Sequence, residues 1–159
     1  MKELATYLND HMAGSVAAIE LLDDLIKVYE NQPLEKFFRD LLSDIRSDQE
    51  VLRKIAQRFK ADESAVRKAG AWIAEKFGRV KLKAAGQKVG ELGLTQALEI
   101  LVLGITGKQL LWRALAATFA SSPLLKGIDL GQLEERAIEQ IDRVEAKRLE
   151  AARAAFLKS

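Results

Sequence analysis

The stretch that decides the fold is ELGLTQALEILVLGITGKQLLWRALAATFA, residues 91–120. Its apolar side chains cover well over half of a helical circumference: Leu94, Leu98, Leu101, Leu103, Ile105, Leu111, Trp112, Leu115 and Phe119. A helix that is apolar so far round is expected to be wrapped by other helices. Glu99, Lys108 and Arg113 interrupt it before it reaches the about 20 apolar residues that a membrane crossing needs. The stretch therefore predicts the most buried helix of an all-α bundle.

Composition limits the remaining possibilities. A chain of 159 residues suits a single domain, residues 1–159, with a continuous core. A net charge of +2 is too small to indicate a nucleic acid or an anionic membrane as partner. The chain has no cysteine, which excludes disulfides and thiolate metal sites. Its first residues lack the basic-then-apolar pattern of a signal peptide, so we expect a cytoplasmic protein.

Apolar residues at spacings of three and four predict helices over about 2–30, 33–60, 91–120 and 130–157. Pro33 suits the first turn of the second of these helices, and Asp129 can cap the last. The turn before Pro33 is short, so the first two helices should form an antiparallel hairpin. A helical crossover over about 63–82 is expected to lead to the second hairpin.

Two helical hairpins joined by one long connection define a four-helix bundle. In helix length and connection order, the chain resembles the ferritin-like superfamily, with up-down-down-up topology. Members with a di-iron centre carry Glu-x-x-His on the second and fourth helices. Here the second helix offers Asp44 and Asp48, the fourth offers Glu145 and Arg148, and the single histidine, His11, lies on the first. The resemblance thus implies the bundle without the di-iron centre, and no cofactor is expected.

Several ionisable residues fall on inward faces near mid-height of the expected bundle. The predicted interior polar cluster consists of His11, Asp48, Lys108, Glu145 and Arg148. In it, the lysine and arginine would replace metal cations and give a metal-free ionic network. A second reading lets Lys108 and Arg148 reach solvent along their aliphatic stems, leaving only Asp48 inside.

A third reading is an unorthodox iron or manganese site drawn from His11, Asp44, Asp48, Glu99 and Glu145. His11 on its own is more typical of a hydrogen-bonded structural histidine than of a metal ligand or base. No spacing motif supports a catalytic site, and no catalytic residue is predicted.

A second charged feature lies in the connection. All charges between residues 76 and 88 are positive: Lys76, Arg79, Lys81, Lys83 and Lys88. They could bind phosphate groups of an anionic surface, or form the solvated face of a crossover helix. The function favoured by the sequence is a non-enzymatic scaffold or interaction protein, expected to be a homodimer with an unknown protein partner. The alternatives are a metal-binding protein and an anionic-surface binder.

Overall fold

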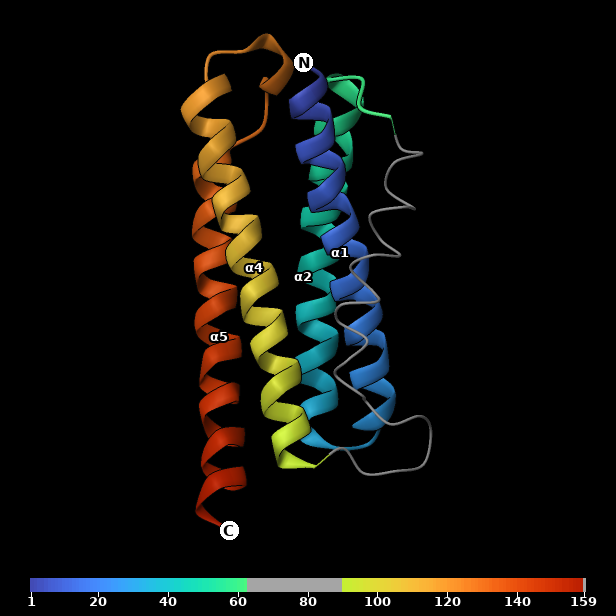
Figure 1. Ribbon diagram of the computed structural model, residues 1–159, viewed down its shortest axis with the longest axis vertical. Helices are drawn as coiled ribbons and strands as arrows, with labels where there is room; N and C mark the ends of the chain where they lie inside the picture. The colour runs from blue at the N-terminus through green and yellow to red at the C-terminus, as the bar shows by residue number, and fades with distance from the viewer. Residues whose placement is uncertain (63–89, 159) are drawn as a thin grey trace.

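The computed structural model describes residues 1–62 and 90–158, and every regular element in these two ranges is helical (Figure 1). The elements are α1 (Lys2–Val28), α2 (Pro33–Arg58), α4 (Glu91–Phe119), the short 3-10 helix η1 (Pro123–Leu125) and α5 (Leu130–Leu157). The four long helices expected from the sequence are confirmed, each ending within two residues of the expected position. The all-α four-helix architecture is therefore shown, whereas the expected crossover helix over 63–82 lies outside the described residues.

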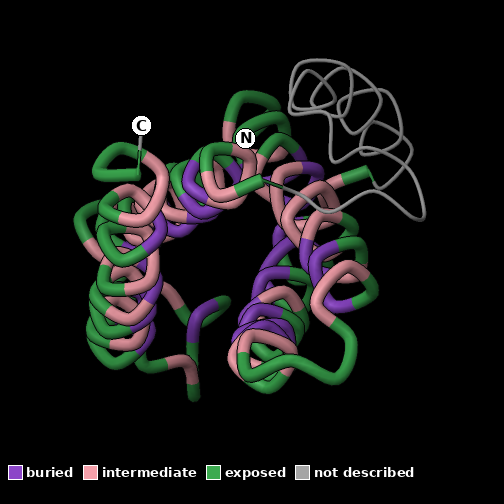
Figure 2. The backbone as a smooth tube through the Cα atoms, turned by 90° about the horizontal axis from the view of Figure 1, so that it is seen from below, coloured by how far each residue is buried: buried purple, intermediate pink, exposed green. Residues whose placement is uncertain are grey.

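The helices form two hairpins. In each pair, α1 with α2 and α4 with α5, the helices run in opposite directions, while α2 and α4 run the same way (Figure 1). Seen along the helix axes, the backbones follow a horseshoe in the order α5, α4, α1, α2 (Figure 2). Close backbone approach between the hairpins occurs between α1 and α4. The backbones of α2 and α5 are further apart, so only long side chains can close that side of the bundle.

Local sequence explains the helix ends. Asn31 adopts φ 62°, a conformation that asparagine tolerates better than most residues, and its N–H donates to Glu35 Oε2 at 2.8 Å. Pro33 occupies the first turn of α2, as predicted. The predicted cap of α5 is confirmed, because Asp129 Oδ1 accepts from the Gln132 N–H at 3.0 Å.

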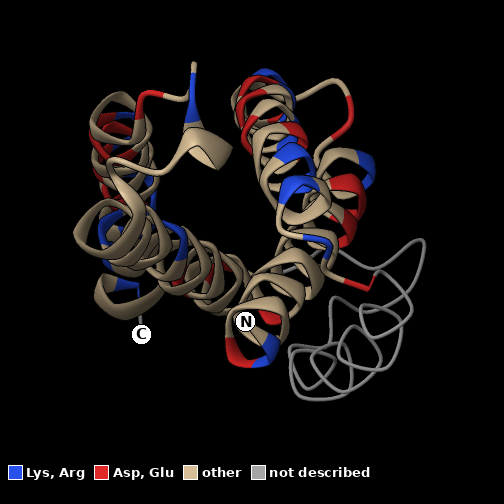
Figure 3. Ribbon diagram, turned by 90° about the horizontal axis from the view of Figure 1, so that it is seen from above, with Lys and Arg blue, Asp and Glu red and all other residues tan. Residues whose placement is uncertain are grey.

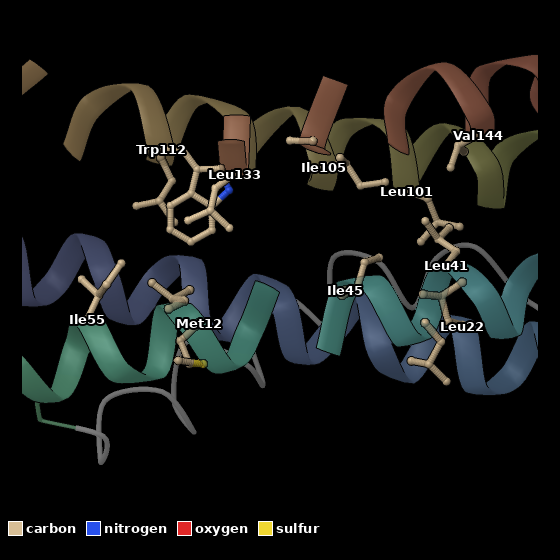
Figure 4. Packing of buried hydrophobic residues seen from close by; sticks show 14 of the residues in the cluster. Met12, Leu22, Leu41, Ile45, Ile55, Leu101, Ile105, Trp112, Leu133 and Val144 are labelled. Atoms are coloured by element: carbon tan, nitrogen blue, oxygen red, sulfur yellow. The ribbon is translucent and has the colours of Figure 1, made fainter. Parts of the chain in front are cut away.

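The hydrophobic core lies between the two hairpins. Figure 4 shows buried side chains of α4 and α5 meeting those of α1 and α2, with the Trp112 indole projecting between the two layers. At one end, Phe59 and Phe119 pack edge to face, with ring centroids 5.2 Å apart. Arg58 donates to the carbonyl oxygens of Leu124 and Lys126, both at 3.0 Å, and so ties α2 to the α4–α5 connection.

Other helices cover the 91–120 helix less completely than its apolar pattern predicts. Leu98, Leu101, Ile105 and Leu115 are buried, but Leu103 is 67% exposed. Leu92 and Leu110 on the same side are also exposed. The reason is the horseshoe arrangement: α4 packs closely against α5 and α1, which leaves one apolar face of α4 without a neighbour among the described helices.

We predict that Leu133→Ala lowers the free energy of unfolding by about 2–5 kcal/mol, because it opens a cavity under a buried side chain of α5. Leu149, on the same helix, is partly exposed, so Leu149→Ala should cost about 1 kcal/mol or less. Urea unfolding of the two variants at one protein concentration measures both effects. Equal losses would contradict the burial pattern of α5.

Candidate functional site at mid-height of the bundle

Asp48 is the most deeply buried charged residue in the described part of the chain. It lies on the inward face of α2 between Ile45 and Leu52, and its side chain is 1% exposed. The carboxylate has three partners from the other hairpin. Its Oδ2 accepts hydrogen bonds from Lys108 Nζ of α4 at 2.6 Å and from Gln140 Nε2 of α5 at 3.0 Å. Arg136 Nη2 of α5 lies 3.2 Å from the other oxygen, Oδ1. A buried carboxylate needs such partners, and here two of them are cations.

Lys108 is held by the same arrangement. Its ammonium donates to Asp48 Oδ2 and to Gln140 Oε1, and its side chain is 16% exposed. Burial lowers the pKa of Lys108, and the Asp48 carboxylate acts in the opposite direction. Lys108, Asp48, Arg136 and Gln140 are referred to below as the Asp48 cluster.

The face of α5 that looks toward α2 is built from long polar side chains. Arg136, Gln140 and Arg143 recur at spacings of four and three, which places them on one side of the helix. Arg143 forms an ion pair with Asp44, one turn before Asp48 on α2. These side chains span the wider separation between α2 and α5, so this seam of the bundle is ionic rather than apolar.

Sequence reasoning missed Arg136 and Gln140. Gln140 of α5 is 1% exposed, whereas the apolar side chain next to it, Ile141, is only half-buried. The available signal was the spacing Leu133, Ala137, Gln140 and Val144, which alternates four and three residues. That spacing places Gln140 on the core face, where its amide can both donate to Asp48 and accept from Lys108.

The predicted polar cluster is only partly brought together. Asp48 and Lys108 are in direct contact, but Glu145 and Arg148 pair with each other, at 2.6 Å. Arg148 also reaches Glu99 of α4 at 3.2 Å, and hydrogen bonding from Arg148 lowers the pKa of Glu145. This second group is more exposed than Asp48, so it is a separate ionic contact between α4 and α5.

The five candidate metal ligands do not assemble either. In the part of the chain that the structure describes, no group of three histidine or carboxylate side chains is arranged to hold a metal ion. Each of Asp44, Asp48, Glu99 and Glu145 has a lysine or arginine partner, which competes with a metal for the carboxylate oxygens. The donor set at mid-height therefore does not fit a di-iron centre.

A cavity of about 470 Å³ lies beside the Asp48 cluster, between α1, α2 and α4. Its wall is mainly apolar and includes Ile45, Leu52, Ile105, Leu111 and Trp112. A smaller set of polar residues completes the lining: Asp10, His11, Ser15, Asp48, Gln49 and Lys108. A mainly apolar cavity of this size with a few convergent polar groups is typical of small-molecule sites.

Small residues keep the cavity open. Gly14 of α1 and Gly104 of α4 line it, and a Cβ added at either position would meet nothing within 4 Å. A Cβ added at Gly107 would lie 4.0 Å from Cε1 of the His11 ring, an ordinary van der Waals contact. The exposed residues Tyr7, Asp10 and Gly104 mark the rim of the cavity.

His11 is a partly buried member of the cavity wall. Its ring packs against Tyr7 in an edge arrangement, with centroids 4.6 Å apart. Burial lowers the pKa of His11 from its ordinary value of 6.5, and the Asp10 carboxylate partly opposes this shift. The imidazole is therefore neutral at pH 7, and it does not add a positive charge to the cavity.

A scan against protein-family models, a search of curated proteins and a search of solved structures each gave no match to this chain.

The candidate anion-binding residues Lys76, Arg79, Lys81, Lys83 and Lys88 lie outside the described residues.

We predict that Lys108→Met lowers the free energy of unfolding by about 3–5 kcal/mol, because it removes one cation from a buried carboxylate. Arg148→Met removes the more exposed ion pairs, which solvent screens, and should lower stability much less than Lys108→Met does. Thermal and urea unfolding compare the two variants. An unchanged melting temperature for Lys108→Met would contradict the structural role of the Asp48 cluster.

The pKa of His11 predicts a pH dependence of stability. Above the unfolded-state pKa of about 6.5, the imidazole is neutral in both states. Below it, the unfolded chain binds the proton more readily, so the free energy of unfolding falls by up to about 1.4 kcal/mol per pH unit until the folded-state pKa is reached. Wild type should therefore lose more stability than His11→Gln between about pH 7 and pH 5.

Because His11 is the single histidine, NMR titration of one imidazole gives the folded-state pKa directly. A value above 6.5, or identical stability profiles for wild type and His11→Gln, would contradict the assignment.

Proposed function

We propose that this protein is a non-enzymatic, metal-free four-helix bundle of ferritin-like arrangement that acts as an interaction protein and forms a homodimer through α4. The observation that carries the proposal is the uncovered apolar face of α4, with Leu92, Leu103 and Leu110 exposed. An exposed apolar face of this kind is typical of a protein–protein interface.

Two observations support the ferritin-like arrangement. The helices α2 and α4 run in the same direction, so α2 ends and α4 begins at opposite ends of the bundle, as in a bundle with one long connection (Figure 1). The Asp48 cluster lies at mid-height, with its carboxylate neutralised by Lys108 and Arg136. In this proposal, fixed side-chain cations take the role that metal ions have in the di-iron members.

The α4 face suits a second copy of the same chain because its charges are self-complementary. Glu99 and Arg113 lie seven residues on either side of Thr106, and both side chains are at least half exposed. If two α4 helices cross antiparallel at Thr106, Glu99 of one copy faces Arg113 of the other, in addition to the ion pairs that the two residues make with α5 of their own chain. Leu103 and Leu110 then flank the two-fold axis, as an isologous interface requires.

By length and composition, α4 is the one helix in the two described ranges that could cross a membrane, a test that the core helix of a soluble protein also passes. Its charged residues are held by neighbouring helices: Lys108 by Asp48, Arg113 by Glu134 and Glu99 by Arg148. These ion pairs support a role within the bundle. Figure 3 shows that the charges of α2 and α5 are of both signs and interspersed, which does not favour nucleic acid as a partner of those helices.

The homodimer is tested by charging the proposed interface. Leu103→Glu combined with Leu110→Glu should convert the protein to a monomer, because the interface would then bury unpaired carboxylates. Leu149→Glu, at a partly exposed position on α5, is the matched control and should remain dimeric. Sedimentation equilibrium measures all three proteins. A monomeric wild type, or a dimeric double variant, would refute the proposed interface.

Elemental analysis of the protein purified without a chelating tag tests the metal-free part of the proposal independently. Iron or manganese at about one per chain would favour the metal-binding alternative.

A further inference from the structure

We propose that the cavity between α1, α2 and α4 binds a small amphiphilic carboxylate, with its apolar body against the cavity wall and its carboxylate at Lys108 and Trp112. This site goes beyond the proposed function and does not involve the exposed leucines of α4. The inference rests on the volume of the cavity, on two side chains with unused hydrogen-bond donor capacity, and on the positive charge of Lys108.

The cavity has the dimensions and chemistry of a ligand site. Its volume of about 470 Å³ falls within the range of about 300–1,000 Å³ common for small-molecule pockets. Isoleucine, leucine and tryptophan side chains from α2 and α4 form much of the wall, and burying an apolar body against them is favourable. A ligand with a hydrocarbon chain or ring therefore fits the larger part of the cavity.

Two donors from α4 have hydrogen-bonding capacity that the protein does not use. An ammonium has three N–H groups, and the Lys108 ammonium donates to two acceptors, Asp48 and Gln140, among the described residues. The Trp112 side chain is buried, and its indole N–H has no hydrogen-bond partner in the described part of the chain. An unpaired buried donor costs about 1–3 kcal/mol, so an acceptor supplied by a ligand would be stabilising.

The two donors belong to the same site. Lys108 and Trp112 are four residues apart, so their side chains project from neighbouring turns on one face of α4. Both residues line the cavity. A ligand head group with two oxygen atoms can accept one hydrogen bond from Lys108 and one from Trp112. A head group with a single acceptor atom is less suited to both donors.

An anionic head group would be attracted by the Lys108 ammonium. The Asp48 carboxylate is in contact with two cations, Lys108 and Arg136. Of these, Lys108 lines the cavity, together with the carboxylates Asp48 and Asp10. His11 is neutral at pH 7 and adds no charge to the cavity. At the rim, Asp10 would repel a carboxylate, so the head group is expected at the Lys108 end and the apolar body toward the rim.

Decanoate is the probe, with methyl decanoate as an uncharged ligand of the same chain length. We expect decanoate to bind one site per chain in calorimetry and to change the fluorescence of Trp112 in a Trp72→Phe background. Methyl decanoate should bind at least about tenfold more weakly, because a hydrogen bond to a charged group is worth more than one to a neutral group. No binding of decanoate, or equal binding of the ester, would overturn the proposal.

Two variants test whether decanoate binds in the cavity. Gly14→Leu with Gly104→Leu adds side chains at two lining positions and should abolish decanoate binding while leaving the Asp48 cluster intact. Gly131→Leu, in the first turn of α5, is the control for adding leucine at a helical glycine and should bind as wild type does.

Trp112→Phe keeps an aromatic ring, removes one donor and should weaken binding about tenfold in calorimetry. Circular dichroism and the melting temperature establish that each variant is folded before binding is compared. Wild-type affinity in the double leucine variant would show that decanoate binds elsewhere and would overturn the assignment.

Discussion

A buried carboxylate on α2 is the constraint on which the rest of the bundle depends. Asp48 is almost fully removed from solvent, and a charge in that position is tolerated only where partners compensate for lost hydration. Its partners come from both helices of the other hairpin: Lys108 from α4, and Arg136 and Gln140 from α5. Sliding either hairpin by one helical turn would separate these groups. The contact therefore fixes the register of three helices. Apolar packing alone fixes register less strictly, because leucine and isoleucine side chains tolerate an exchange of apolar neighbours.

The seam between α2 and α5 follows from the same constraint. Arginine and glutamine side chains are long, and they cross a separation at which the two backbones make few close contacts. The other seams are closed by apolar residues such as Leu101, Trp112 and Leu133, which pack at shorter range (Figure 4). The horseshoe shape of the backbone thus reflects two kinds of packing: long polar side chains between α2 and α5, and apolar contacts at the other seams. The same arrangement leaves one face of α4 without a neighbour among the described helices, and Leu103 exposed.

Some of this could be predicted from the sequence. The periodic apolar spacing placed the four helices, and Pro33 and Asp129 marked two of their ends. Asp48 stood out because it interrupts an otherwise apolar face between Ile45 and Leu52. Its partners on α5 could not be identified in the same way, because arginine and glutamine near a helix face are equally compatible with solvent exposure.

The exposed face of α4 was missed because apolar periodicity reports that a surface is apolar, and not whether another helix covers it. The cavity was missed because it is created by glycines, whose lack of a side chain has no periodic signature.

The ionic cluster and the cavity are parts of one packing solution. If the positions of Asp48 and Lys108 held leucines, favourable apolar contact would draw α2 toward α4, and the space beside them would close. An ion pair with its hydrogen bonds is directional, so it sets a separation and holds it, and the glycines of α1 and α4 leave that space unfilled. Lys108 belongs to both features, since it binds Asp48 and lines the cavity. A ligand that accepts a hydrogen bond from its third N–H would bind the folded state alone and stabilise it by mass action, so occupancy of the cavity and stability of the bundle are thermodynamically linked through one ammonium group.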